Sequence, residues 1–456
     1  MTEPSTTSLE ALAAQTPATR ERYVDFLRAA SIMVVVFGHW LMAVVTVADG
    51  RLKVGNVIAI TPGLWALTWV LQVMPIFFFV GGYANAAGLQ PRKGLTSSYP
   101  EWIRSRVTRL MRPVGLLLLV WIPIMLVLEQ SSIDQKNVRD LTTLVSQPLW
   151  FIGVYLIVCA AAPPMLRLYQ RTPVGSIAGL MLGAIAVDLG RFLGDSEQVG
   201  YLNFALIWLI AQQLGFAYHS GALRRVRSPQ WFAVGIAAII VLALLVTFGP
   251  YPASMVGLPG QKISNMAPPT ICLLALMVLQ VSIAMILRDS ATSWLERAHP
   301  WKFTIAVNSA IMTIFCWHLT AAVLVVAVLN AVGAPFPSGG SATWWLTRPI
   351  WLLVLLVILG LLIGAFSRFE RGALMKRNPH PALPASTARV GIAVLAVLLL
   401  IIGLLGIAGN GLTHVLETRT PILGFIGFSP ITSLAEIVAG VVLSGAGGVW
   451  GKPTRI

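Results

Sequence analysis

The 456-residue chain is too apolar to be an ordinary soluble protein. Apolar residues make up 57% of it and charged residues 11%, with a mean hydropathy of +0.80, whereas soluble domains carry about 25% charged residues. The composition therefore predicts an all-α, polytopic membrane protein. The net charge of +15 does not indicate nucleic-acid binding, because most basic residues form short clusters between apolar segments, as they do in membrane loops.

The cysteines and the N-terminal residues exclude further classes of protein. Cys159, Cys272 and Cys316 all lie in apolar segments, a pattern that predicts neither a disulfide framework nor a metal site. The first twenty-odd residues are polar and lack the apolar core of a signal peptide, so the first membrane helix is expected to act as the insertion signal.

Ten apolar stretches predict a membrane core within residues 23–370, after a cytoplasmic tail over residues 1–22. They lie at about 26–48, 62–88, 113–128, 147–168, 174–190, 200–218, 230–248, 269–287, 303–332 and 344–366. Residues 371–456 are expected to add one or two helices. One lies at about 390–409, and an apolar run at about 421–450 is either a twelfth span or an interfacial segment.

Basic residues show which side of the membrane each loop faces. They are far more frequent in the loops on the side of the N-terminus than in the alternate loops, so the positive-inside rule predicts a cytoplasmic N-terminus. Arginine outnumbers lysine, and Ala, Gly, Leu and Val dominate, which suggests a GC-rich bacterial genome and hence a bacterial plasma membrane. No internal repeat is evident, unlike in many secondary transporters.

The first predicted helix carries two ionisable residues on one face. Arg28 and His39 are eleven residues apart, so on a helix they lie within about 20° of one face and roughly 16 Å apart along the axis. Ionisable residues at membrane depth are candidates for function. Arginine suits a phosphate at the cytoplasmic mouth, and histidine suits proton transfer. Alternatively, Arg28 is a flanking cation paired with Asp25, and His39 a packing contact.

Two further features are candidate sites. Arg104, Arg106, Arg109 and Arg112 precede Pro113, and the last three have the spacing of a loose helical stripe, which is either a positive-inside anchor or a phosphate clamp. In TIFCWHLT, His318 is either functional or a polar packing contact. Its neighbour Cys316 does not share a helix face with it, so we expect no Cys–His catalytic pair.

The remaining polar residues in the predicted membrane helices are expected to be contacts between helices. They are Gln72, Asn85, Asp188, Gln212, Gln213, Gln280 and Asn308.

Several motifs, in order, resemble the acyltransferase type 3 family of integral membrane acyltransferases. RYVDFLRAASIMVVVFGHW resembles its first helix, in which an acidic residue precedes an arginine and a histidine follows the arginine after ten intervening residues; Asp25, Arg28 and His39 match. FFFVGGYANA resembles its second-helix FF-x-x-SGF pattern, with Gly81 in place of the usual serine and Tyr83 in place of phenylalanine. RSRVTRLMRP, PLWFIGVYLIVCAAAPP and FCWHLT resemble its arginine-rich loop, fourth helix and late histidine motif. The resemblance covers residues 20–370.

The resemblance implies a ten-helix membrane enzyme that transfers an acyl group, commonly acetyl, from cytosolic acyl-CoA to an extracytoplasmic hydroxyl on a cell-envelope glycan or glycolipid. His39 would be the general base or would carry the acyl group. Arg28 and the arginines of residues 104–112 would hold the donor's phosphates. His318 would orient the acceptor or stabilise the oxyanion, with Asp25, Trp150 and Tyr155 in support. We expect acyl-CoA as a donor substrate, no permanently bound cofactor and no metal.

Two other functions remain open from the sequence alone. The same polar groups could line the path of a transporter or lipid flippase, although no repeat is evident and intramembrane carboxylates are few. A non-catalytic scaffold would tolerate exchange of Arg28 and His39.

Overall fold

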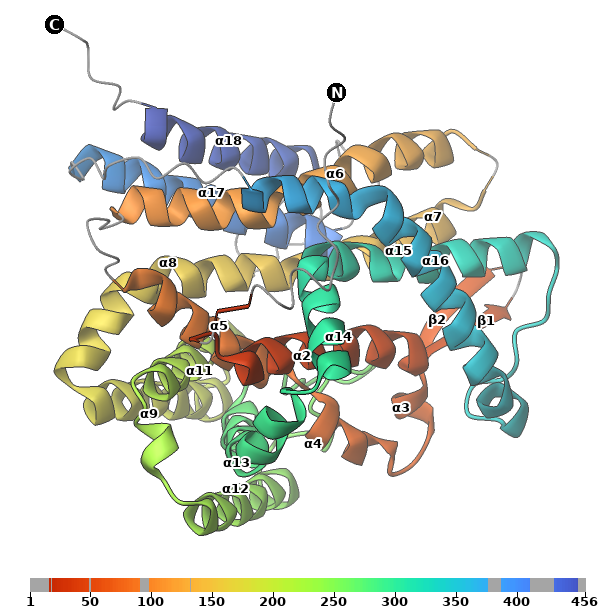
Figure 1. Cartoon of the computed structure of the whole chain (residues 1–456). Coiled ribbons are helices and arrows are strands. Elements are labelled where there is room, and N and C mark those ends of the chain that lie inside the picture. The colour runs from red at the N-terminus through yellow and green to blue at the C-terminus, as the bar shows by residue number, and fades with distance from the viewer. Residues whose placement is uncertain are drawn as a thin grey trace, which may run out of the picture.

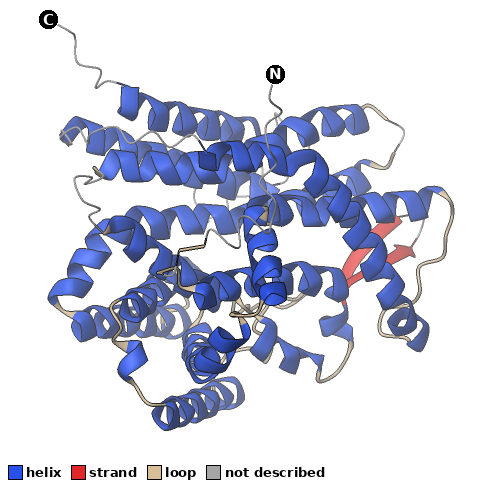
Figure 2. Cartoon of the chain, in the orientation of Figure 1, coloured by secondary structure: helices blue, strands red, loops and turns tan. Residues whose placement is uncertain are grey.

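The computed structural model describes residues 16–17, 19–48, 51–90, 98–131, 133–375, 387–410 and 430–449. The described chain is almost entirely helical, with one two-stranded hairpin (Figure 2). Within it, 11 helical segments are long and apolar enough to cross a membrane. The prediction of an all-α polytopic membrane protein is confirmed. Most of the expected tail over residues 1–22, and parts of the region 371–456, lie outside the described residues.

The first helix is shorter than predicted, because a β-hairpin follows it. Helix α2 spans Arg22–Met42, and strands β1 (Ala43–Ala48) and β2 (Arg51–Asn56) pair antiparallel, Ala43 opposite Asn56. The prediction of helix to residue 48 is wrong: the run AVVTVA is rich in β-branched residues, which favour strands over helices. The hairpin lies at the right of Figure 1, at the C-terminal end of α2.

The second predicted helix, 62–88, is broken. Short helices α3 (Val57–Ile60), η1 (Leu64–Leu67) and α4 (Thr68–Leu71) precede α5 (Met74–Leu89). Pro75 begins α5, and side-chain amides satisfy main-chain groups at the break. The Gln72 side chain accepts a hydrogen bond from Met74 N, and Gln280 Nε2 donates one to Gln72 O at 2.8 Å.

The third helix is much longer than the predicted 113–128. Helix α6 spans Tyr99–Glu129 and includes all four arginines of the predicted stripe. Ser98 and Glu101 form a capping box at its start. Pro113 lies inside the helix and does not begin it, an arrangement that membrane helices tolerate. The polar loop expected after it contains the amphipathic helix α7 (Gln135–Ser146).

The next elements agree with the predictions within a few residues. They are α8 (Leu149–Arg171), α9 (Pro173–Leu193), the short α10 (Glu197–Gly200), α11 (Asn203–His219), η2 (Leu223–Arg225), α12 (Ser228–Phe248) and α13 (Ile271–Trp294). Helices α5 and α11 pack main chain to main chain. A Cβ at Gly82 would lie 2.3 Å from Gln212 O, and one at Gly215 would lie 2.2 Å from Phe79 O, so only glycine fits at these positions.

The predicted helix 303–332 is two helices. Helix α14 (Ala298–Ser309) ends at Ala310, and α15 (Ile311–Ala331) begins there. Glu370 of α16 (Ala342–Met375) caps the new start, because its carboxylate accepts from Met312 N and from both the N–H and the hydroxyl of Thr313, at 2.7–3.1 Å. Helices α17 (Thr387–Asn410) and α18 (Pro430–Val449) lie beside each other and near α6 (Figure 1).

Candidate active site

Helix α2 carries the two predicted ionisable residues, and each contacts the same neighbouring segment. Arg28 contacts Asn308 of α14, and His39 contacts His318 of α15. The helical rise separates Arg28 and His39 by roughly 16 Å along the axis. The two positions therefore mark two polar contacts along one face of α2.

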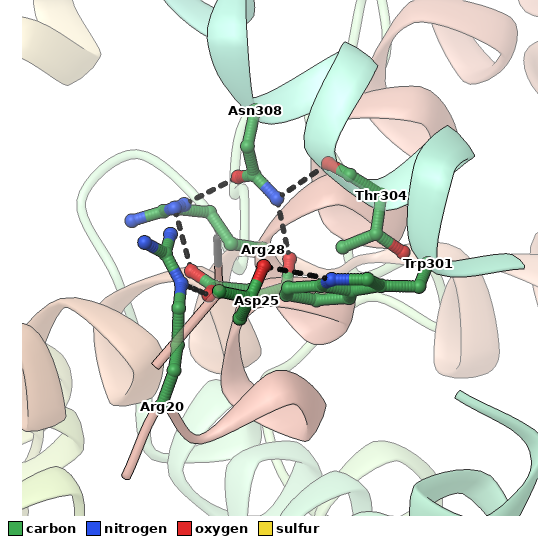
Figure 3. A network of polar contacts seen from close by, with 7 residues as sticks. Arg20, Asp25, Arg28, Trp301, Thr304 and Asn308 are labelled. Atoms are coloured by element: carbon green, nitrogen blue, oxygen red, sulfur yellow. Dashed lines mark hydrogen bonds and ion pairs between the residues drawn. The ribbon is translucent and has the colours of Figure 1, made fainter. Parts of the chain in front are cut away.

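Arg28 is held between a carboxylate and an amide (Figure 3). Its Nη2 donates to Asp25 Oδ1 at 2.8 Å, and its Nε donates to Asn308 Oδ1 at 2.6 Å. Asp25 also accepts from Arg20 Nε at 2.6 Å. In the part of the chain that the structure describes, Nη1 of Arg28 makes no hydrogen bond, so it is available to an anionic ligand.

Asn308 is locked in the orientation that serves Arg28. Its Nδ2 donates to the main-chain oxygens of Asp25, at 2.8 Å, and Thr304, at 2.9 Å. With both amide hydrogens used, only Oδ1 faces Arg28. The sequence predicted Asn308 as a packing residue. The signal that could have singled it out is its position ten residues before His318, close to the spacing of Arg28 and His39.

The two predicted histidines form a pair. His39 Nδ1 lies 2.9 Å from His318 Nε2, with the ring planes 10° apart. His318 Nδ1 lies 2.7 Å from the main-chain oxygen of Phe315. Helices α2 and α15 meet at this pair, and Trp40 Nε1 donates to His318 O at 2.9 Å beside it.

The contacts of the pair determine where its protons lie. A carbonyl oxygen only accepts, so His318 Nδ1 carries the proton that it donates to Phe315 O. In the neutral ring, His318 Nε2 is then an acceptor, and His39 Nδ1 must donate to it. The one ring nitrogen of the two histidines whose lone pair accepts no hydrogen bond between them is then His39 Nε2. His318 is fully buried, whereas His39 is only partly buried, so the free lone pair belongs to the less buried of the two rings.

The four arginines of α6 do not lie together. Arg104, Arg109 and Arg112 are exposed, whereas Arg106 is half-buried and stacks on the Trp102 ring at 4.1 Å. The Nε atom of Arg106 is buried without a hydrogen-bond partner. Arg109 is close enough for its charge to act on Arg28. Arg109 therefore lies near Arg28, Arg106 lies near Tyr155, and Arg104 and Arg112 are exposed on the helix surface.

Tyr155 lies near Arg28, Arg106 and Arg109, whereas the contacts of Trp150 are with other aromatic rings. The charges of Arg28, Arg106 and Arg109 all act on Tyr155, and its ring packs against Phe151. A Cβ at residue 81 would lie 3.0 Å from the Tyr155 ring, which explains glycine at this position in place of the family's serine.

Trp150 instead packs edge-to-face against Phe151 and Phe204. Trp150 therefore has a packing role, and it contacts Tyr155 only indirectly, through Phe151, whose ring stacks on Tyr155.

Most of the predicted packing residues do bind neighbouring helices. Gln212 donates to Val158 O at 2.6 Å, and Asp188 accepts from Asn203 at 2.8 Å. Cys316 is buried with a free thiol, and among the described residues it makes no hydrogen bond to His318. Within the described ranges, no group of three or more His, Cys, Asp or Glu side chains could hold a metal ion.

A family model described as an acyltransferase domain matches residues 21–368. The matched range contains both ends of the site, from Asp25 and Arg28 to His318. Comparisons with curated proteins and with solved structures gave no match.

Proposed function

Because the chain belongs to this acyltransferase family and is a multi-pass membrane protein, it is a membrane acyltransferase, and we propose that it moves an acyl group, normally acetyl, from cytosolic acyl-CoA to a hydroxyl of a cell-envelope glycan or glycolipid. The observation that carries the proposal is the pairing of His39 with His318, which leaves a lone pair on His39 Nε2, on the same helix as an arginine with a free N–H group.

The length of the donor fits the spacing of Arg28 and His39 along α2. Acyl-CoA has a phosphorylated head and a long thin arm that ends in the thioester. Arg28 Nη1, Arg106 Nε and the exposed Arg109 would bind the phosphates, since guanidinium groups form strong charge-assisted hydrogen bonds to them. The arm would then run along α2 for roughly 16 Å towards His39. The exposed Arg104 and Arg112 would act as surface anchors.

His39 would act as the general base. Its Nε2 takes the proton from the acceptor hydroxyl, the hydroxyl oxygen attacks the thioester carbonyl, the carbon–sulfur bond breaks, and the departing thiolate takes the proton back from Nε2. While His39 is protonated, its Nδ1–H donates to His318 Nε2 and the positive charge is shared with the second ring. Both ring nitrogens of His318 are thus engaged, so we assign it the orientation of His39 and not a contact with the acceptor.

The orientation in the membrane is part of the proposal. The excess of basic residues in the loops on the side of the N-terminus supports a cytoplasmic N-terminus in a bacterial plasma membrane. An impermeant maleimide should label Gln261→Cys in intact cells and Arg225→Cys only after permeabilisation, because the native cysteines Cys159, Cys272 and Cys316 are buried. The reverse labelling pattern would place the donor site outside.

The experiment that tests the function uses purified membranes and radiolabelled acetyl-CoA. The wild-type protein should transfer label to an envelope extract, and His39→Ala should transfer it about 10²- to 10⁴-fold more slowly, the usual contribution of a general base. His299→Ala is the matched control, because His299 is exposed at the start of α14. This variant should transfer label at the normal rate. Normal transfer by a folded His39→Ala protein would refute the role.

The same membranes separate the alternatives. A transporter or flippase would move a lipid or sugar without consuming acetyl-CoA, and a scaffold would be indifferent to His39→Ala and to Arg28→Ala. Acetylated protein trapped in the absence of an acceptor would instead show that His39 carries the acyl group.

A further inference from the structure

A pocket opens at the end of α2 that lies away from Arg28. Its volume is about 520 Å³, and two segments line it: residues 58–65, which follow the β-hairpin, and residues 253–261, in the loop between α12 and α13. This volume is within the roughly 300–1,000 Å³ range of small-molecule sites. In Figure 1 the segment around α3 and α4 lies below the C-terminal half of α2.

The walls of the pocket are tied together by hydrogen bonds. Trp69 Nε1 donates to Ala253 O at 2.8 Å, and Met255 N donates to the Thr68 hydroxyl at 2.9 Å. Asn265 Nδ2 donates to Ser254 O at 2.9 Å, which folds the second segment back on itself. These bonds hold the two segments in place, so the pocket exists before a ligand arrives.

The loop is also fixed to the helix bundle. The Tyr251 hydroxyl donates to Asp188 Oδ2 at 3.0 Å. Burial and the neighbouring Asp188 carboxylate raise the pKa of Tyr251, so the hydroxyl stays protonated and remains a donor.

The lining chemistry suits an uncharged, hydroxyl-rich ligand. None of the lining side chains is ionisable, so nothing in the pocket would compensate a ligand charge. Thr61 and Gln261 supply a hydroxyl and an amide, the half-buried Trp65 supplies an aromatic surface, and Pro-Gly segments expose main-chain groups at residues 62–63 and 259–260. Gly63 and Gly260 have φ values of +78° and +80°, which other residues rarely adopt.

The β-hairpin limits how far the pocket can lie from the histidine pair. Strand β1 starts at Ala43, four residues after His39, and Ala43 pairs with Asn56, which is two residues before Ile58 in the pocket wall. With the rise of a helix, the spacing of paired strands and two extended residues, Ile58 is at most about 19 Å from His39. Ile58 and Trp65 also belong to the same apolar cluster as Met42, one turn beyond His39.

We propose that this pocket binds one uncharged sugar unit of the acceptor, so that a hydroxyl of an adjoining unit reaches His39. The inference rests on the proposed function, and it adds the place and the charge class of the acceptor. In this arrangement the donor binds at Arg28, near one end of α2, and the acceptor binds beyond the other end. The proposed base, His39, lies between them.

Direct binding tests the pocket independently of acyl transfer. Saturation-transfer NMR on the full-length protein, in a detergent without a sugar headgroup, should show binding of maltose, lactose or cellobiose but not of digalacturonic acid. Trp65→Ala and Gln261→Leu should each weaken the disaccharide Kd about tenfold, the effect of roughly 1.4 kcal/mol. Phe248→Ala, an exposed aromatic at the end of α12, is the matched control and should bind like the wild type.

In the binding assay, two results would overturn the inference: no neutral disaccharide binds the wild-type protein, or the Kd is the same in Trp65→Ala. The proposed function fails separately. If disaccharides bind through Trp65 but label never leaves acetyl-CoA, the pocket is a sugar site and the assignment of the donor is wrong. If label is transferred with the same acceptor KM in the Trp65 and Gln261 variants, the enzyme is confirmed and the pocket is not its acceptor site.

Discussion

Removing the hydrogen bond between the two histidines should slow turnover by an amount that the geometry sets. In His318→Leu, His39 Nδ1 loses the acceptor that lies 2.9 Å away. A bond between neutral groups contributes about 0.5–1.5 kcal/mol and a bond to a charged group about 1.5–3 kcal/mol. The bond therefore gains roughly 1–1.5 kcal/mol when His39 takes a proton, which corresponds to about 5- to 13-fold in kcat.

The assay is a kinetic cycle on purified protein in detergent. His318→Leu should lower kcat by this factor with little change in the KM for acetyl-CoA, and His318→Gln should recover most of the rate, because its amide oxygen can accept from His39 Nδ1. The double variant His39→Ala/His318→Leu should be no slower than His39→Ala, since residues that act as a unit are not additive.

If the fold reductions in kcat of His39→Ala and His318→Leu multiply in the double variant, the two histidines do not act as one catalytic unit. An unchanged kcat in a folded His318→Leu protein would show that His318 is a packing residue.

Three other changes follow from the structure. Asn308→Asp places a second carboxylate against Arg28 and should raise the KM for acetyl-CoA about tenfold or more, with a smaller change in kcat; an unchanged KM in initial-rate measurements contradicts donor binding at Arg28. Gly82→Ala should abolish the monodisperse peak in size-exclusion chromatography, because its Cβ would overlap α11, whereas Gly115→Ala, with nothing within 4 Å, should elute normally. Glu370→Gln weakens the cap of α15 and should lower stability by about 1–3 kcal/mol, read as a lower melting temperature; no change would show that the cap is dispensable.

Segments with one strong periodic signal could be predicted from the sequence, and segments with competing signals could not. Apolar runs of membrane length located several core helices within a few residues, among them α8, α9, α11 and α12. The run at residues 43–48 is equally apolar, but its valines favour a strand once residues 51–56 are there to pair with it. Pro113 was interpreted as a helix start, and it lies inside α6 because the preceding turns carry their own capping box.

The residues of the site also divide into those that could be predicted from the sequence and those that could not. Arg28, His39 and Asp25 could be placed on one helix from their spacing, because that relation is local. The contact of His39 with His318 joins residues 279 positions apart, and no spacing rule predicts it. Asn308 looked like any polar residue in a membrane helix, and its role depends on two main-chain oxygens whose positions only the fold provides.

The break between α14 and α15 is what allows both contacts with α2. Arg28 and His39 are eleven residues apart (39 − 28) and share a helix face, whereas Asn308 and His318 are ten apart (318 − 308) and on a continuous helix would be about 80° off one face. The non-helical turn at Ala310, with φ −126° and ψ 21°, changes the direction of the chain between them, and Glu370 satisfies the N–H groups that the break frees. Helix α2 itself keeps Arg28 and His39 at a constant separation. The two contacts with one capped segment fix their side chains on that helix, as the proposed acyl transfer requires of a phosphate-binding arginine and a base.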